Sequence, residues 1–200
     1  MDLKRSFDDC SHATMGARKG RPLTVVLFIK PFSALPIDVR TAAIQIYVST
    51  FNSRPRNECW TWGTASRYLN SHNAKLTITV ISYTGQTVTG FAIGTPAKYH
   101  HVTKELPKYL VNRRTYYISV VAVRKFTRNR GVGTILIRKM LRAAAKTGYH
   151  KFLCRTRADA IPARNLFETI GFNAILSYIS TIGGDTSDRV IYGKPNVRKL

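Results

Sequence analysis

One stretch of the chain constrains its fold more than any other: an apolar strand that passes through a short glycine loop into an amphipathic helix. Residues 116–123 form the β-branched and aromatic run of a buried strand. Residues 128–133 read Arg-Asn-Arg-Gly-Val-Gly, and residues 134–146 place their apolar side chains on one helical face. The glycines allow a tight turn and close backbone approach. Free N–H groups at the start of the helix then predict an anion site suited to a phosphate or pyrophosphate.

The remaining sequence alternates strands and helices. We expect strands at residues 23–29, 76–83, 87–93, 151–154, 174–180 and 190–192, and helices at 36–48, 64–69 and 162–170. Residues 1–22 are polar and basic and are expected to form a flexible tail. Residues 23–200 are expected to form a single mixed α/β domain.

Charge is the unusual feature of the composition. The chain carries 32 Lys and Arg against 10 Asp and Glu, a formal net charge of +22, which indicates an anionic partner. No apolar run approaches the length of a membrane-spanning helix, and the first 20 residues lack the apolar core of a secretory signal, so neither class of protein is expected. Three widely spaced cysteines are expected to be reduced thiols, typical of the cytoplasm, with the nucleus as the alternative compartment.

The glycine loop does not fit two common nucleotide-binding templates. It lacks the Gly-Lys-Ser/Thr of a Walker A loop. It also lacks the third glycine of a dinucleotide fingerprint and the acidic residue that should follow about 20 positions later.

A third template does fit. Val121-Ala-Val123, Arg128, Gly131 and Gly133 match in register a strand ending Leu-x-Val-x-Pro followed by Arg/Gln-x-x-Gly-x-Gly/Ala, with Lys125 where proline is usual. Ala163 to Phe172 is similar to a second motif, Ala-x-x-Leu-Tyr-x-x-x-Gly-Phe, and Tyr47 to Thr61 is loosely similar to a third. In this order, the motifs resemble those of the GNAT family of acetyl-CoA-dependent N-acetyltransferases, over about residues 23–193.

The resemblance implies a GNAT-like fold, with a central, mostly antiparallel sheet that splays at the cofactor strand and is flanked by helices. Acetyl-CoA would be the acyl donor, and a primary amine would attack its thioester directly. Val121, Ala122 and Val123 would lie along the pantetheine arm, with the Val121 N–H holding the developing oxyanion. Cofactor contacts would also come from Arg128, Asn129, Arg130, Gly131, Val132, Gly133, Thr134 and Phe167.

Proton transfer is where this sequence departs from the family. The tyrosine that commonly protonates the leaving thiolate falls at Phe167, which has no hydroxyl. We predict that Glu58, Tyr117 and Tyr178 handle protons; the alternatives are Tyr116, Ser119, Cys154 or water. A structural role, in ion pairing or core packing, is the alternative for Glu58 and for the tyrosines. The Tyr99-His100-His101 stretch has only Glu105 at a ligand spacing, so no metal site is expected.

Basic residues concentrate in one part of the sequence. Residues 106–158 contain 14 Lys and Arg and no acidic residue. Coenzyme A would account for three or four of them. Arg138, Lys139, Arg142 and Lys146 form a stripe on the predicted helix, which favours a nucleic-acid partner such as a tRNA that carries the acceptor amine. The alternative is a non-catalytic nucleic-acid-binding protein on the same scaffold, which would not need acetyl-CoA.

Overall fold

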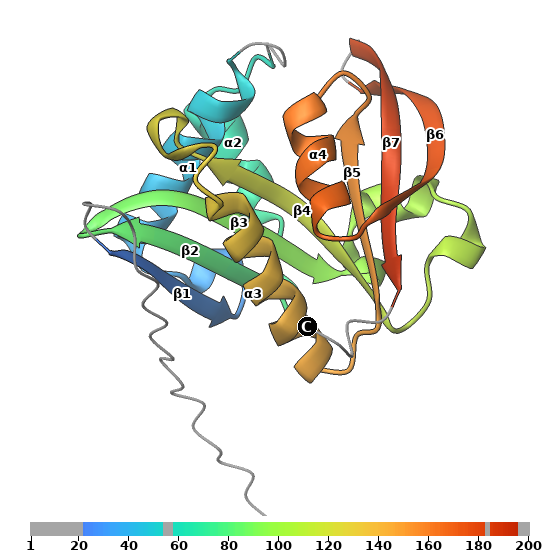
Figure 1. Cartoon of the computed structure of the whole chain (residues 1–200), viewed down its shortest axis with the longest axis horizontal. Coiled ribbons are helices and arrows are strands. Elements are labelled where there is room, and N and C mark those ends of the chain that lie inside the picture. The colour runs from blue at the N-terminus through green and yellow to red at the C-terminus, as the bar shows by residue number, and fades with distance from the viewer. Residues whose placement is uncertain (1–21, 54–57, 183–184, 196–200) are drawn as a thin grey trace, which may run out of the picture.

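The computed structural model describes residues 22–53, 58–182 and 185–195 (Figure 1). The expected tail therefore lies outside the described residues, apart from Pro22. The strands are β1 (Leu23–Ile29), β2 (Ile78–Thr84), β3 (Thr87–Pro96), β4 (Thr115–Val123), β5 (Lys151–Arg157), β6 (Asn173–Ile182) and β7 (Asp185–Pro195). The α-helices are α1 (Ile37–Phe51), α2 (Trp62–Asn70), α3 (Val132–Lys146) and α4 (Ile161–Thr169). The 3-10 helices are η1 (Phe32–Ala34), η2 (Ala97–Tyr99), η3 (His101–Glu105), η4 (Lys108–Leu110) and η5 (Lys125–Thr127).

Every expected strand and helix is present, which confirms the mixed α/β prediction. The largest difference is β7, which begins at Asp185 rather than at residue 190 because it pairs along the whole of β6. Residues 97–110, which show no periodicity in the sequence, contain three of the short 3-10 helices. Such turns need only i to i+3 hydrogen bonds and leave no long repeat to detect.

The seven strands form one sheet in the order β1-β2-β3-β4-β5-β7-β6. Neighbouring strands are antiparallel except β4 and β5, which are parallel and pair only from Thr115↔Lys151 to Ile118↔Cys154. Beyond that point β4 continues against β3, while β5 continues against β7. The sheet therefore splays between β4 and β5, as the resemblance implied, and the second half of β4 has a free edge.

A bulge in β4 coincides with the start of the splay. Ile93 pairs with Val120 but Gly94 pairs with Ile118, so Ser119 is the extra residue on β4. The bulge turns Ser119 and Val120 toward the same face of the sheet, and bulges commonly end pairing in this way. A Cβ on Gly94 would lie 2.5 Å from Tyr116 Cε1 and 2.8 Å from Met140 Sδ, so glycine is required there.

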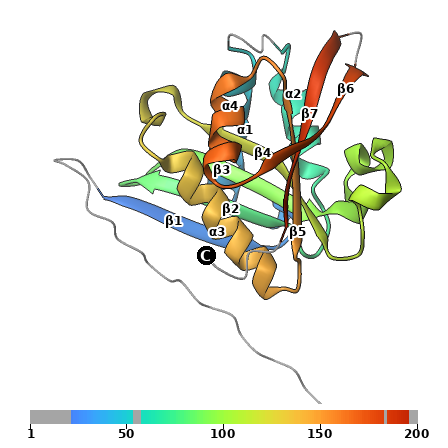
Figure 2. The same ribbon diagram turned by 45° about the vertical axis from the view of Figure 1, so that its right-hand side comes forward.

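Different helices cover the two faces of the sheet (Figures 1 and 2). On one face, α3 and α4 bury a core that includes Leu136, Met140, Phe152 and Phe167. On the other, α1 and α2 cover β2 to β4, and the 3-10 segment forms a separate core with Tyr117, Leu153 and Ile191. We call these two sides of the sheet the α3/α4 face and the α2/η3 face. The gap between β4 and β5 is bordered by both.

Candidate active site

The N-terminus of α3 lies at the open part of the splay. Gly131 is its N-cap, with φ 76°, and no side chain caps the helix; Asn129 is also left-handed, with φ 59°. A Cβ on Gly131 would meet no atom within 4 Å, so the space in front of the helix is open. The first turn contains no acidic residue. Uncapped N–H groups and the positive end of the helix dipole make this a site for an anion.

Two arginine side chains hold the loop before α3 in place and thereby fix the directions of its backbone N–H groups. The Nε of Arg128 donates to the Val123 carbonyl at 3.0 Å, and the Nε of Arg124 donates to the Val88 carbonyl at 2.7 Å. α4 borders the same opening, because a Cβ on Gly133 would lie 3.0 Å from Leu166 Cδ2. The helix N-terminus, the free edge of β4 and α4 therefore surround one space.

Phe167 belongs to the core beneath this space. It is 5% exposed, and its ring lies 5.5 Å from that of Phe172 and 6.1 Å from that of Tyr192. The hydroxyl of Tyr192 is itself used, since it accepts a hydrogen bond from Arg164 and donates one to Glu168. On the α3/α4 face, the side chain at position 167 thus contributes packing and has no proton to give.

On the α2/η3 face, Ser119 at the bulge is the centre of a hydrogen-bonded group that we call the Ser119 cluster. Its Oγ lies 3.1 Å from Tyr68 Oη, 2.6 Å from His72 Nε2 and 2.9 Å from His100 Nε2. Tyr68 lies on α2, His72 follows it, and His100 precedes η3. Three segments far apart in the sequence therefore meet at the residue where the sheet begins to splay.

The contacts of the second ring nitrogens fix the histidine tautomers. His72 Nδ1 lies 3.1 Å from the Leu69 carbonyl, which can only accept, so Nδ1 carries the proton and Nε2 accepts from Ser119. His100 Nδ1 accepts from the Val102 N–H at 3.3 Å, so its Nε2 carries the proton and donates to Ser119. The Ser119 hydroxyl has one proton and donates it to His72, so in its contact with Tyr68 the tyrosine hydroxyl is the donor. The hydrogen bonds of the Ser119 cluster thus run from Tyr68 through Ser119 to His72.

Both histidines of this cluster are neutral at physiological pH. Burial lowers the pKa of His72 from 6.5 to about 4. Burial also lowers the pKa of His100, to about 2, and the proximity of Arg155 and of two other ionisable rings, His72 and His101, adds to the effect. An imidazolium would be poorly solvated at these positions. The Ser119 cluster is therefore polar but uncharged.

Arg155 supplies the charge on this face. It comes one residue after the last β4–β5 pair, so it would be opposite Ser119 if the ladder continued. Its Nη1 donates to Tyr178 Oη at 3.0 Å and lies 3.6 Å from Glu105 Oε2. Its side chain is 13% exposed. Burial raises the pKa values of Tyr68 and Tyr117, and the positive charge of Arg155 opposes that rise. Burial lowers the pKa values of His100 and His101, and the same charge adds to that effect, so all four side chains lie within the field of Arg155.

The three residues predicted to handle protons lie around this group. Tyr117 is 3% exposed, its ring centroid lies 4.4 Å from that of His100 with the ring planes tilted by 33°, and burial raises its pKa well above 10. Tyr178 accepts the hydrogen bond from Arg155. Glu58 Oε2 accepts from Trp60 Nε1 at 2.6 Å, and the Trp60 ring lies 5.4 Å from that of Tyr68. The structure therefore brings Tyr117 and Tyr178 to Arg155, and connects Glu58 to the Ser119 cluster through Trp60 and Tyr68.

Two of the alternatives occupy other environments. Tyr116 faces the α3 side, where its hydroxyl donates to the Gly94 carbonyl at 2.6 Å and accepts from the Ile78 N–H at 2.9 Å. Cys154 is fully buried, and burial raises its thiol pKa well above 9. Ser119 is the alternative whose hydroxyl reaches the splay.

Sequence reasoning did not single out Tyr68, His72 or Arg155. Tyr68 and His72 lie four residues apart at the end of α2, and only the fold brings them to Ser119 and Arg155. His100 was considered solely as a metal ligand, and among the described residues no group of His, Cys, Asp and Glu could hold a metal ion. The one available signal was the position of Arg155, directly after the apolar residues of the strand that pairs with β4.

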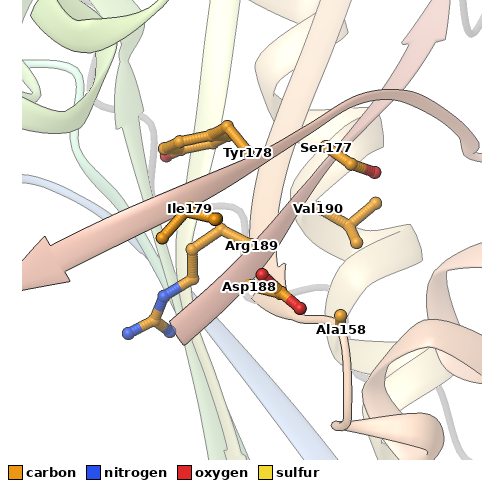
Figure 3. A pocket seen from close by; sticks show the side chains of 7 residues that line it. All are labelled: Ala158, Ser177, Tyr178, Ile179, Asp188, Arg189 and Val190. Carbon is orange, nitrogen blue, oxygen red and sulfur yellow. The ribbon is translucent and has the colours of Figure 1, made fainter. Parts of the chain in front are cut away.

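A shallow cavity lies on the β6–β7 hairpin (Figure 3). Its volume is about 360 Å³, and its lining includes Tyr178 and Arg189, which are paired across the two strands. Figure 3 shows these two side chains extending to one side of the hairpin and those of Ser177 and Val190 to the other. A second cavity, of about 740 Å³, lies at the opposite end of β5 near Arg114 and Lys194.

The basic stripe on α3 is only partly free. Arg138, Arg142 and Lys146 are exposed along the helix. Lys139 differs, because its Nζ donates to the Val25 carbonyl of β1 at 2.7 Å. Lys139 therefore ties α3 to the edge of the sheet, and the exposed stripe consists of the other three residues.

Comparison with known proteins agrees with this fold. The Acetyltransferase (GNAT) family matches residues 41–172. An acetyltransferase of the GNAT family from Desulfovibrio desulfuricans has a similar structure, with TM-score 0.62 and 19% identity over 86% of this chain and 98% of that one. The ribosomal-protein-S18-alanine N-acetyltransferase from Escherichia coli gives 0.63 and 16%, over 88% and 96%. YncA from Salmonella typhimurium, described as an acetyltransferase and solved with acetyl-CoA, gives 0.63 and 12%, over 88% and 96%.

The chain belongs to the GNAT acetyltransferase family. Members of this family transfer acetyl groups, and acetyl-CoA is their acyl donor. No curated protein matches the chain by sequence. None of the helices in the described part of the chain has the length and apolar character needed to cross a membrane.

Proposed function

We propose that this protein transfers the acetyl group of acetyl-CoA to a primary amine by direct attack of the amine on the thioester. The observation that carries the proposal is the pairing of an uncapped, open α3 N-terminus with a free β4 edge. A pyrophosphate fits the first, and an extended arm with amide groups fits the second. Acetyl-CoA contains both parts, so the residues present fit it.

The residues that would hold acetyl-CoA follow from this fit. The backbone of Arg128 to Thr134 binds the pyrophosphate, and Val121, Ala122 and Val123 lie along the pantetheine arm. The Val121 N–H stabilises negative charge on the carbonyl oxygen as the amine attacks, which is electrostatic preorganisation. Phe167 supports α4 from the core. When bound, acetyl-CoA supplies an activated acyl group.

The amine approaches from the α2/η3 face, since the α3/α4 face is taken by the acyl donor. An ammonium cannot attack a thioester, so a proton must leave the amine first. Tyr117, Tyr178 and Glu58 lie close enough to this face to handle protons directly or through water. Because Phe167 has no hydroxyl, the proton for the departing thiolate comes from this face or from water.

A second candidate concerns the acceptor. Arg138, Arg142 and Lys146 form an exposed cationic stripe that acetyl-CoA at the α3 N-terminus would leave uncovered. A phosphate backbone along this stripe would release counterions and would deliver an amine carried on a nucleic acid, such as an aminoacyl-tRNA. The same stripe supports the alternative of nucleic-acid binding without catalysis.

Calorimetric titration with acetyl-CoA at elevated salt tests the proposal, since high salt suppresses nonspecific binding of an anion to a protein of charge +22. We expect saturable binding to the native protein and none to Gly131→Trp, whose side chain fills the open space. Gly148→Trp is the matched control: Gly148 also has a positive φ, 93°, and open space, but follows the other end of α3. Absence of binding to the native protein would reject acetyl transfer and favour the binding-only alternative.

A further inference from the structure

Part of the Arg155 guanidinium has no protein partner among the described residues. Nη1 is used by Tyr178 and Glu105. Within the described part of the chain, Nε and Nη2 make no hydrogen bond, yet neither is among the polar atoms that are enclosed without a partner. These two donors therefore keep some accessible surface, although the side chain as a whole is only 13% exposed. Nε and one Nη2 proton form the fork that binds a carboxylate in a bidentate manner.

The position of Arg155 ties this fork to the reaction. Phe152 and Cys154 of β5 point into the α3/α4 core, whereas Leu153 packs with Tyr117 on the other face. Alternation along the strand then places Arg155 on the α2/η3 face, beside the Ser119 cluster. Ser119 and Arg155 are the first residues beyond the last β4–β5 pair, so they stand on opposite sides of the splay at its narrow end.

The ion pair with Glu105 does not explain Arg155. Its 3.6 Å distance exceeds that of a good charge-assisted hydrogen bond, and the Glu105 side chain is 50% exposed. A mostly buried cation needs a partner that compensates its lost hydration, and this contact compensates it only in part. The neighbouring histidines are neutral and add no positive charge, so one anionic group on a ligand would balance the charge of Arg155.

We propose that the acceptor is an amine that also carries a carboxylate, with an amino acid as the simplest case, and that Arg155 binds the carboxylate. The inference rests on the acetyl transfer proposed above. The carboxylate binds to Nε and Nη2 of Arg155 while the amine faces the free edge of β4 across the splay. The acceptor class therefore differs from a polyamine, which would bring only positive charge to a cation.

The test compares acceptors that differ only in charge. The native protein is incubated with acetyl-CoA and each of the common amino acids, or with the corresponding amino-acid amides, and N-acetylated products are measured by mass spectrometry. We expect kcat/KM for the best amino acid to exceed that for its amide by roughly 10- to 100-fold, the usual contribution of hydrogen bonds to a charged group. Preference for amides, polyamines or an aminoacyl-tRNA would overturn the inference while leaving acetyl transfer intact.

Variants test whether the preference for amino acids over their amides depends on Arg155. Arg155→Gln should reduce the ratio between acid and amide to near 1, mainly through KM, and Arg155→Lys should retain part of it. Glu105→Gln should lower KM for the amino acid, because it removes a competing carboxylate. Arg113→Gln, on an exposed loop residue, is the control and should change neither value. An unchanged ratio in Arg155→Gln would overturn the inference.

A binding measurement covers the case in which no product forms. Amino acids are added to the protein saturated with CoA, and the Arg155 Nε–H signal is followed by NMR. We expect that signal to shift with amino acids and not with their amides. No shift and no product would overturn the inference, whereas failure of acetyl-CoA to bind in calorimetry would overturn the proposed function itself.

Discussion

The two faces of the splayed sheet are built in different ways. The α3/α4 face takes its site from one continuous stretch, the β4 strand, the glycine loop and the start of α3. The α2/η3 face assembles its site from Tyr68, His72, His100, Ser119 and Arg155, which come from different segments. The first face offers backbone N–H groups to a ligand, and the second offers side chains. A site made of backbone N–H groups depends on the loop conformation, whereas a site made of side chains depends on the identity of each residue.

Acid should destabilise the folded protein through the buried histidines of the α2/η3 face. The pKa of His72 is about 4 in the folded chain and 6.5 in the unfolded one. Between these two pH values the unfolded state binds a proton at His72 and the folded state does not, so the unfolded state is favoured. The stability is fully present above pH 6.5 and is lost as pH falls toward 4. His72 alone accounts for about 3 kcal/mol over this range. Urea unfolding between pH 7 and pH 4.5 measures the loss.

His72→Gln keeps a polar side chain but removes the titration, so its stability should fall less steeply over the same range. The His100 ring, whose pKa is about 2, should leave a residual slope. Equal slopes in the native protein and His72→Gln would show that the destabilising protons bind elsewhere.

Gly94→Ala should disturb both faces at once. Its Cβ would meet Tyr116 Cε1 at 2.5 Å and Met140 Sδ at 2.8 Å, within the core and beside the bulge. We expect a loss of about 2–3 kcal/mol, the upper part of the range for overpacked cores. Gly63→Ala is the control, because Gly63 lies in α2 and its Cβ would have only Thr61 Oγ1, at 4.0 Å. That variant should be as stable as the native protein or slightly more stable, and similar losses in both would refute the close-approach argument.

Ser119→Ala should affect the α2/η3 face alone. It removes the hydroxyl that His72, His100 and Tyr68 share and leaves His72 Nε2 buried without its donor. An unsatisfied buried group costs about 1–3 kcal/mol, so thermal unfolding should shift accordingly. Acetyl-CoA affinity should stay within about twofold, since the α3 loop is untouched. A large loss of acetyl-CoA affinity would mean that the two faces are not separable.

The difference between a site made from one contiguous segment and a site assembled from distant segments also explains what could be predicted from the sequence. The β4 strand, the glycine loop and α3 are contiguous, so periodicity and glycine positions predicted them, and the resemblance of the ordered motifs to the GNAT family implied the fold. Tyr117 and Tyr178, predicted to handle protons, both lie on the α2/η3 face, but the prediction did not include their neighbours there. Tyr68, His72 and Arg155 were missed because their proximity depends on a bulge at Ser119 and on where β5 leaves β4, and neither has a local pattern. Lys139 looked like part of the basic stripe because helical spacing cannot reveal its contact with the Val25 carbonyl.

The smallest effect concerns the exposed stripe, which belongs to neither side of the splay. Arg138→Glu with Arg142→Glu should flatten the dependence of log K on log salt for single-stranded or transfer RNA by about 2, because fewer counterions are released. Folding stability should change by at most about 0.5 kcal/mol, since the residues are exposed and the existing like charges repel only weakly. Lys104→Glu with Lys108→Glu makes an equal change in net charge on exposed residues away from α3. If both pairs flatten the slope equally, RNA binding reflects the net charge of +22 rather than the stripe, and the nucleic-acid-borne acceptor loses its structural support.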